Sequence, residues 1–483
     1  MTKPGEVRAI IIGAGMSGIM AAIKLREAGV AVSVHEKADK VGGTWRDNSY
    51  PGLSCDVPSH AYSYSFALNP DWSCHYAPGQ EIQAYFESVA KQFEIVDLIR
   101  FGSQVTDAVW VDDHWQITTA DGFSDEAEII IAATGVLHHP NMAKIPGLDD
   151  FAGKSFHSAR WDHNAQTAAQ RVGVIGTGST AVQITSALAD EAEHFSLFQR
   201  TAQWVMPLPN PSYDQQEQDR LRSNPHAHAR LHRYLNDSMT VRLSNHLINA
   251  DSEVMAEVEA QCEANLNTVV DPDLRQRLRP DYRAACKRLV VSPDFYDKVQ
   301  RPNVELVTSA IAKIEPEGVR TVDGKLHNLD VLVLATGFKV DSFVRPMNVV
   351  GLDGHTLDEM WDPRPVAYLA IGVPQVPNFF MLNGPNGPVG NFSLIEIAEQ
   401  QMGYIMGLVD EIVSGRCQAI APSGDATEAY ESERAEACTN TIWMTGCRSW
   451  YLDDRGIPAT WPWTFDRFNA EMSAPNLDHY TTR

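Results

Sequence analysis

The chain has 483 residues, of which 44% are hydrophobic and 21% charged, and its formal net charge is −23. The length suggests roughly two to four domains, and the acidic balance argues against non-specific nucleic-acid binding because phosphate backbones would be repelled. No apolar run approaches the roughly 18 residues of a membrane-spanning helix and the first residues lack the apolar core of a signal peptide, so we expect a cytoplasmic protein.

The first predicted unit is a strand, a glycine-rich turn and a helix. Residues 7–12 are mostly apolar and rich in β-branched side chains, and the sequence Gly-Ala-Gly-Met-Ser-Gly follows at residues 13–18. In this context Gly13 allows the tight turn, Gly15 lets a pyrophosphate approach the backbone, and Gly18 lets the helix pack on the strand. A second strand at residues 30–36 ends in Glu36, where a carboxylate can bind ribose hydroxyls. We interpret this unit as a site for FAD.

Residues 42–56, Gly-Gly-Thr-Trp-Arg-Asp-Asn-Ser-Tyr-Pro-Gly-Leu-Ser-Cys-Asp, lack periodicity and are predicted to form a functional loop. Its candidate site residues are Gly43, Thr44, Trp45 and Asp56. The alternatives are a turn-capping role for Asp56 and a core position for Trp45. A helix at residues 81–93 and strands at 105–110, 115–120 and 128–133 are predicted to follow.

Residues 151–162 are predicted to form a linker with the spacing Phe-x-Gly-x-x-x-His-x-x-x-Trp-Asp. Its characteristic residues are Phe151, Gly153, His157, Trp161 and Asp162. The His157 ring could act as an acid or base, but we favour a hydrogen-bonded hinge residue.

A second fingerprint follows the strand predicted at residues 171–175. Its turn, Gly-Thr-Gly-Ser-Thr-Ala at residues 176–181, places Gly176, Gly178 and Ser179 at the start of a helix. The next strand, residues 194–199, leads into Arg200 and Thr201 and has no terminal acid. An arginine at this position fits a 2′-phosphate, so we predict NADPH here, with an unrelated surface arginine as the alternative.

A polar helical insertion is predicted at residues 211–299, and Lys287 and Arg288 stand near its end. Its histidines, His226, His228, His232 and His246, lack a carboxylate motif, so no metal is expected. Strands are predicted at 306–314, 319–322 and 330–335. The chain then returns to the first unit with a strand at 379–382, a glycine-rich turn containing Asn383, and a long helix.

The seven cysteines are irregularly spaced and none forms a Cys-x-x-Cys motif. This pattern disfavours disulfide scaffolds and predicts reduced structural thiols. The missing dithiol also argues against the flavin disulfide reductases.

The linker spacing, together with Gly42, Gly43, Trp45, Tyr50, Pro51, Gly52 and Asp56, resembles the fingerprints of the type I Baeyer–Villiger monooxygenases. The resemblance implies that the 42–56 loop lies along the flavin, that Asp56 orients an active-site arginine, and that the linker couples domain movement to the cofactor. It also implies that Lys287 reaches the 2′-phosphate and Arg288 the flavin edge. A tryptophan of the tail contacts NADP⁺ or substrate in this family; Trp450 is the candidate, with Trp461 or a packing role as alternatives.

We therefore expect an α/β fold with two Rossmann-like domains, the second inserted into the first. Residues 1–150 and 330–483 would bind FAD, and residues 151–329 would bind NADP. The resemblance implies that NADPH and dioxygen are used to convert a ketone to an ester or lactone through a C4a-peroxyflavin that Arg288 stabilises. Alternatives are oxygenation at nitrogen or sulfur, a reductase that passes electrons to a protein, and a non-catalytic nucleotide-binding module. No membrane, nucleic-acid or obligate protein partner is expected.

Overall fold

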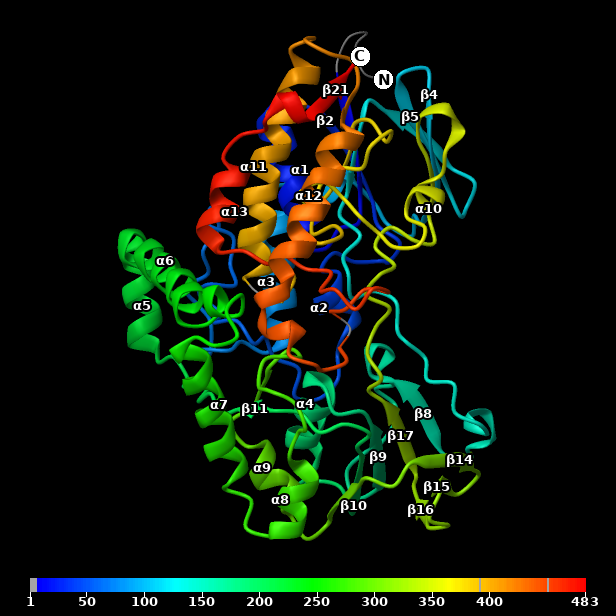
Figure 1. The fold of residues 1–483 in the computed structure, drawn as a ribbon, viewed down its shortest axis with the longest axis vertical. Helices are drawn as coiled ribbons and strands as arrows, with labels where there is room; N and C mark the ends of the chain where they lie inside the picture. Colours follow the sequence, from blue (N-terminus) through cyan, green and yellow to red (C-terminus); the bar gives the residue numbers. More distant parts are fainter. Residues whose placement is uncertain (1–6, 391, 450) are drawn as a thin grey trace.

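Two parallel sheets organise the molecule in the computed structural model, which describes residues 7–390, 392–449 and 451–483 (Figure 1). Each sheet has five strands and carries one of the glycine-rich fingerprints at the end of a central strand. The predicted α/β fold with two Rossmann-like units is thereby confirmed. We call them the first and the second unit.

The sheet of the first unit combines strands from both ends of the chain. Its order is β19-β7-β1-β2-β3, with bounds Phe379–Met381, Ile129–Ala132, Arg8–Ile12, Ala31–His35 and Ile99–Arg100. Its main helices are α1 (Met16–Glu27), α3 (Gly79–Gln92), α11 (Leu394–Val413), α12 (Gly424–Ala437) and α13 (Phe465–Met472). Helix α1 packs against β1, β2, α3 and α11, so the buried core of this unit joins residues more than 350 positions apart.

Smaller sheets complete the first unit. One joins β18, β4, β5 and β6 (Asn348–Val350, Val105–Val111, His114–Thr119 and Ser124–Ala127), with α10 (Leu357–Met360) beside β18. The antiparallel pair β20 (Ile420–Pro422) and β21 (Tyr480–Thr482) attaches the C-terminal segment to this unit.

The second unit has the sheet order β13-β10-β9-β17-β8. These strands span Val304–Val307, His194–Phe198, Arg171–Ile175, Val331–Leu334 and Lys154–His157. Helices α4 (Ser179–Leu188) and α9 (Phe295–Val299) contact each other, and a meander of β14 (Ile311–Glu315), β15 (Gly318–Thr321) and β16 (Leu326–Asn328) extends the unit.

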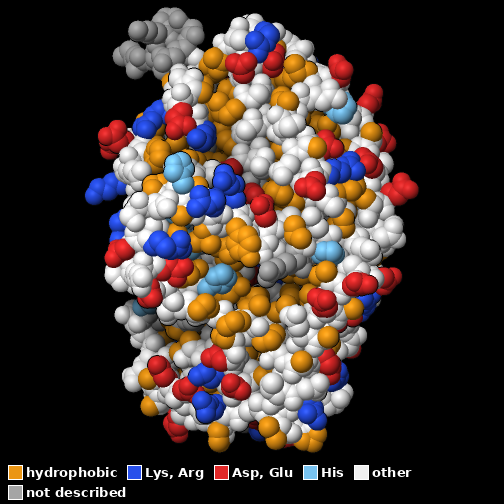
Figure 2. All heavy atoms as spheres, turned by 90° about the vertical axis from the view of Figure 1, so that its left-hand side faces the viewer, with side chains coloured by type: hydrophobic (Ala, Val, Ile, Leu, Met, Phe, Trp, Pro, Cys, Tyr) orange, Lys and Arg blue, Asp and Glu red, His pale blue; other side chains and the backbone are white. Residues whose placement is uncertain are grey.

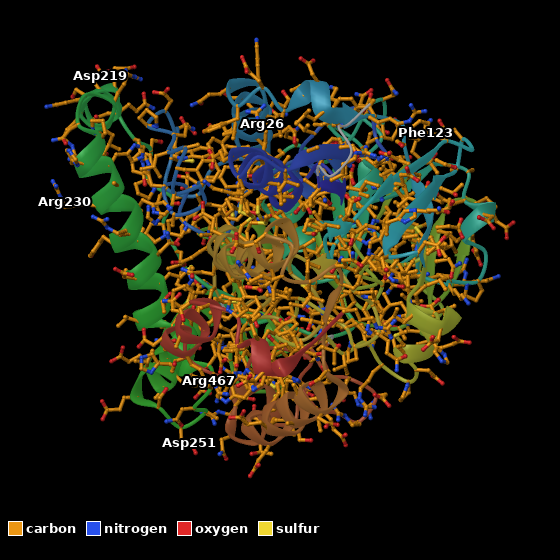
Figure 3. All side chains as sticks on the ribbon, turned by 90° about the horizontal axis from the view of Figure 1, so that it is seen from above. Arg26, Phe123, Asp219, Arg230, Asp251 and Arg467 are labelled. Carbon is orange, nitrogen blue, oxygen red and sulfur yellow. A yellow bond between two sulfur atoms is a disulfide. The ribbon has the colours of Figure 1, made fainter. Side chains whose placement is uncertain are left out.

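The insertion forms helices α5 (Gln215–Ser223), α6 (Pro225–Arg242), α7 (Glu253–Leu266) and α8 (Pro272–Leu278). The two-stranded pair β11 (Val205–Met206) and β12 (Val290–Val291) lies at its base. Asn224 caps α6 by accepting a hydrogen bond from the amide of Ala227, and Pro225 occupies the first turn. Seen from above, the segment between the labelled Asp219 and Asp251 lies along one side of the molecule (Figure 3).

Three segments and one domain boundary differ from the prediction. The expected linker contains β8, whose Lys154 and Ser155 are exposed at the sheet edge, so the sequence lacks the apolar alternation of a strand. The expected loop at 42–56 contains the one-turn helix α2 (Thr44–Asp47), and the strand predicted at 306–314 is divided into β13 and β14. Strand β17 pairs with β8 and β9, so the second sheet extends to Leu334 and includes residues that the predicted boundary at 330 assigned to the first unit.

Acidic and basic side chains are scattered among apolar patches on the face shown in Figure 2. Within the described ranges, no helix combines the length and the apolar composition that crossing a bilayer requires.

Candidate active site

One cavity of about 2550 Å³ lies between the two units. Pockets for a single small ligand are usually about 300–1,000 Å³, so this cavity can hold more than one ligand. Most predicted site residues line it, namely Gly13, Gly15, Glu36, Gly43, Thr44, Trp45, Asp56, Gly176, Gly178, Ser179, Arg200, Thr201, Lys287, Arg288 and Asn383. The structure thus brings both fingerprints, the 42–56 loop and the end of the insertion to one place.

The turn of the first fingerprint requires glycine for two separate reasons. Gly13 has φ +104°, and a Cβ atom there would lie 2.6 Å from the carbonyl oxygen of Ala133 at the end of β7. Gly18 lies behind the cavity in α1, and a Cβ atom there would overlap the carbonyl oxygen of Gly13. Gly15 faces Gly43 of the next loop. The strand, the helix and the loop therefore pack against one another through backbone alone.

Glu36 is buried at the end of the second strand, and protein groups already bind its carboxylate. It accepts hydrogen bonds from the amides of Ala14 (2.8 Å) and Ala38 (2.9 Å) and forms an ion pair with Arg46 at 3.0 Å. A carboxylate has about four lone-pair sites, so three donors leave room for about one further hydrogen bond. That capacity fits one ribose hydroxyl.

The 42–56 loop connects the two units. The Tyr50 hydroxyl donates to Oε1 of Gln183 in α4 at 2.8 Å, and burial raises the pKa of Tyr50 to about 12. A Cβ atom at Gly52 would lie 2.5 Å from the Gln183 carbonyl oxygen. Trp45 donates to the Tyr62 hydroxyl at 3.1 Å. Gln183 contributes to this connection although the sequence did not mark it as a functional residue.

The second fingerprint is more open than the first. Gly176 has φ +135° and faces Ala335, but a Cβ atom at Gly178 would meet nothing within 4 Å. Ser179 begins α4 beside it, and the Thr177 hydroxyl donates to the carbonyl oxygen of Thr201 at 2.6 Å. The space above Gly178 and the helix N-terminus is suited to a phosphate group.

Two cations lie next to this opening. Arg200 is exposed, and the Nζ atom of Lys287 lies 4.4 Å from the ring centroid of Tyr282. Burial lowers the pKa of Lys287, and the positive charge of Arg200 lowers it further while Asp281 opposes the change. Two neighbouring positive charges at the edge of a cavity favour an anionic ligand, which fits a 2′-phosphate.

Arg288 and Asp56 form an ion pair at 2.5 Å although they are 232 positions apart. The charge of Asp56 is the largest cause that raises the pKa of Arg288, and burial opposes it. The Arg288 side chain keeps 37% of its surface accessible and lines the cavity. A fixed positive charge therefore faces the interior of the site.

Asn383 follows β19 and lies in the left-handed region with φ +56°. Its amide donates to Gln401 at 2.8 Å and its Nδ2 donates to the hydroxyl of Ser17 at 3.2 Å. Its Oδ1 atom is buried and has no hydrogen-bond partner within the described part of the chain. A buried acceptor of this kind is costly, so it fits a ligand that carries a hydrogen-bond donor.

The residues of the predicted linker lie outside the cavity. Phe151 is buried in the core of the second unit, and Gly153 lies against the backbone of Asp330. His157 is buried and accepts a hydrogen bond from the amide of Ala159 at 3.1 Å. Burial lowers the pKa of His157, and the ring does not line the cavity, so the hinge role stays a prediction. Trp161 packs on Phe156, and Asp162 lies 3.8 Å from Lys154.

The tail contains the two tryptophans considered from the sequence and one residue, Tyr451, that the sequence did not single out. Trp450 lies outside the described residues. Trp461 is buried and packs on Phe468 and Trp463, which corresponds to the packing role considered for it. Tyr451 is buried, lines the cavity and forms a side-chain hydrogen bond with Arg288. In the sequence, the only indication of a role for Tyr451 was its position next to Trp450.

The prediction that every cysteine is a reduced thiol is wrong for one pair. Cys286 and Cys447 form a disulfide with a Cα–Cα distance of 6.1 Å. The two residues are 161 positions apart and meet only because the tail folds over the end of the insertion. An argument from sequence spacing cannot detect such a pair. Cys55, Cys74, Cys262, Cys417 and Cys438 are free.

Comparisons with known proteins agree with this geometry. Residues 10–261 match the family model described as pyridine nucleotide-disulphide oxidoreductase. The chain is 45% identical to an uncharacterised monooxygenase of Mycobacterium tuberculosis, over 93% of this chain and 90% of that protein. It is 38% identical to a Baeyer–Villiger monooxygenase of Streptomyces coelicolor, over 98% and 92% of the two chains. The structure resembles cyclohexanone monooxygenase of Rhodococcus sp. Phi1 bound to NADP⁺, with a TM-score of 0.88, 29% identity and complete coverage of both chains.

Proposed function

This chain belongs to the type I Baeyer–Villiger monooxygenases, and we propose that it inserts one oxygen atom next to the carbonyl of a small ketone to give an ester or lactone. It is an FAD-containing monooxygenase, and its cofactors are FAD and NADPH. The single observation that carries the proposed reaction is the Asp56–Arg288 ion pair at the cavity where the two units meet.

The residues at each fingerprint fit the cofactor assigned to it. In the first unit, the Gly15 backbone lines the cavity and would face a pyrophosphate, Glu36 has capacity for a ribose hydroxyl, and the Asn383 Oδ1 atom accepts a donor from the cofactor. In the second unit, Gly178 leaves space for a phosphate while Arg200 and Lys287 bind the 2′-phosphate. When bound and reduced, the flavin supplies the reactive oxygen from dioxygen.

Arg288 has an electrostatic role in this proposal. Attack on a ketone requires an oxygen atom that carries negative charge, and the charge then moves onto the carbonyl oxygen. The Arg288 guanidinium stabilises both positions because it is always protonated and faces the cavity. Asp56 orients the guanidinium by holding its Nη2 atom.

The decisive experiment incubates the purified holoenzyme with NADPH, a panel of ketones and ¹⁸O-labelled dioxygen. We expect one labelled oxygen atom in an ester or lactone, and a loss of about 10²- to 10³-fold in this product for Arg288→Ala, comparable to the removal of an oxyanion donor. Flavin content should not change. Arg288→Lys retains the charge without the planar fork and should retain part of the activity.

The same assay separates the alternatives. Label in an N-oxide or sulfoxide, with none in any ester, would assign the chain to nitrogen or sulfur oxygenation. Oxidation of NADPH without product, accelerated by an added electron-accepting protein, would indicate a reductase. Full ester formation by Arg288→Ala would contradict the role of Arg288.

A further inference from the structure

Residues 441–449 and Tyr451 pack over the Arg288 side of the cavity. Trp443 and Tyr451 are both buried, with ring centroids 5.9 Å apart. They belong to one apolar cluster with Leu247 from the insertion and with Ala284 and Ala285, which precede Arg288 by a few positions. The tail therefore rests on the residues that carry the active-site arginine.

A covalent bond fixes this arrangement. The disulfide joins Cys286, two positions before Arg288, to Cys447, four positions before Tyr451. Neither cysteine lines the cavity, so the sulfur atoms are placed to hold the two segments together rather than to contact a ligand. The bond thus connects the segment of Arg288 directly to that of Tyr451.

Tyr451 and Asp56 hold different parts of the same guanidinium. Asp56 binds the Nη2 atom of Arg288. The Tyr451 hydroxyl and the Nη1 atom of Arg288 lie together beside Gly390, and the two side chains are hydrogen-bonded. A carboxylate contact at one nitrogen leaves the guanidinium free to turn about that contact, and a second acceptor at the other nitrogen fixes its plane. Burial raises the pKa of Tyr451, so the phenol remains neutral and leaves the charge of Arg288 available.

We propose that Tyr451 is a positioning residue that fixes the plane of the Arg288 guanidinium, and that the Cys286–Cys447 disulfide holds Tyr451 in place. This inference rests on the proposed role of Arg288 in the oxygenation. A displacement of about 1 Å at a reacting group can cost on the order of 10²-fold in rate, so loss of a single orienting contact should cost about tenfold.

The disulfide also makes this positioning sensitive to thiols. In exchange with an external dithiol, the Cys286–Cys447 bond breaks, two protein thiols form and the dithiol becomes a cyclic disulfide. Apolar packing and the Tyr451–Arg288 hydrogen bond, without a covalent bond, then hold the tail on Arg288. The sequence predicts a cytoplasmic protein, and disulfides in that compartment are usually transient or redox-sensing.

The first test compares Tyr451→Phe with the wild-type holoenzyme. We expect kcat for ester formation to fall about tenfold, KM for the ketone to stay within about twofold, and NADPH to be consumed with release of hydrogen peroxide. The rate of flavin reduction by NADPH should not change. A variant with wild-type kcat and wild-type coupling of NADPH to ester would overturn the role of Tyr451.

A second measurement does not depend on turnover. Arg288 carries charge next to the flavin in this proposal, so the visible circular dichroism of the bound flavin should change in Arg288→Ala and shift partly in the same direction in Tyr451→Phe. An unchanged spectrum in Tyr451→Phe, with a changed one in Arg288→Ala, would also reject the role of Tyr451. If the wild-type enzyme forms no ester, the proposed function is wrong. The flavin spectrum of Tyr451→Phe still tests the contact between Tyr451 and Arg288 in that case.

The tether is tested by peptide mapping without reductant and by limited proteolysis. We expect a cross-linked peptide containing Cys286 and Cys447, and faster cleavage between residues 438 and 460 after treatment with dithiothreitol. The double variant Cys286→Ala, Cys447→Ala should be cleaved quickly without reductant and lose ester formation to the same degree as Tyr451→Phe. Cys417→Ala, which removes a free buried cysteine elsewhere, serves as the matched control. Absence of the cross-linked peptide, or a double variant with wild-type cleavage and coupling, would refute the tether.

Discussion

The two nucleotide-binding units share one fold and differ in how closely protein atoms pack around the nucleotide site. In each, a glycine with positive φ follows the central strand and faces an alanine at the end of a neighbouring strand: Gly13 faces Ala133, and Gly176 faces Ala335. The third position of the fingerprint is Gly18 in the first unit and Ala181 in the second. The turn and the following helix are therefore packed more closely in the first unit, where this position is glycine, than in the second, where it is alanine.

The ends of the second strands show the same difference. Glu36 is buried and bound by Arg46 and two amides, whereas Arg200 is exposed and Gly178 has open space above it. A site closed by protein contacts suits a cofactor that is retained, and an open cationic site suits one that is exchanged in each cycle. The contrast follows from a few residues on a common fold, so it can be tested residue by residue.

The largest expected effect comes from Gly18→Ala. The added Cβ atom would overlap the Gly13 carbonyl oxygen, which β1 and the turn hold in place. We expect a loss of about 3 kcal/mol in stability, as for overpacked cores, and purified protein that contains far less than one FAD per chain. The flavin-to-protein absorbance ratio and the thermal unfolding temperature measure both effects.

The opposite change in the second unit is the matched control. Ala181→Gly removes one buried methyl group from α4 and should cost about 1 kcal/mol through helix propensity, without loss of FAD. Equal FAD content and equal melting temperatures in the two variants would show that close packing does not distinguish the units.

The second prediction concerns Arg200→Ala at the open site. Loss of a charge-assisted contact of about 1.5–3 kcal/mol should lower kcat/KM for NADPH by about 10- to 100-fold and leave kcat/KM for NADH unchanged. Arg320→Ala, on the β14–β16 meander and outside the cavity, is the control. Steady-state kinetics with both nucleotides measure the ratio, and an unchanged preference for NADPH would remove Arg200 from the site.

Local patterns predicted both fingerprints because a strand, a glycine turn and a helix are encoded within about 25 neighbouring residues. The Arg288–Asp56 pair came from a family resemblance, since no local pattern connects residues 232 positions apart. The contact of Tyr50 with Gln183, the buried acceptor of Asn383 and the disulfide depend on how distant segments meet in space. Strand β8 escaped prediction because its edge position permits exposed polar residues.

The smallest prediction tests a connection between the units outside the cavity. His60 of the first unit and His228 of α6 lie 3.0 Å apart between Nδ1 and Nε2, and both are buried. Burial is the main cause that lowers the pKa of His60 to about 3. Repulsion by the positive charges of His228, His75, His232 and Arg220 lowers it further. Burial and then His232 lower the pKa of His228 to about 4, which Asp71 opposes.

Because these pKa values are lower in the folded state, the unfolded chain takes up protons first as the pH falls below about 6.5. Stability is therefore complete above that pH and is lost as the pH decreases towards 4. His228→Gln should remove one histidine's share, about 1 kcal/mol between pH 6.5 and 5.5, and flatten the dependence of the melting temperature on pH. His226→Gln, which changes an exposed residue of the same helix, should leave that dependence intact. Equal slopes for the two variants would mean that the insertion is anchored on the first unit by packing rather than by this neutral histidine pair.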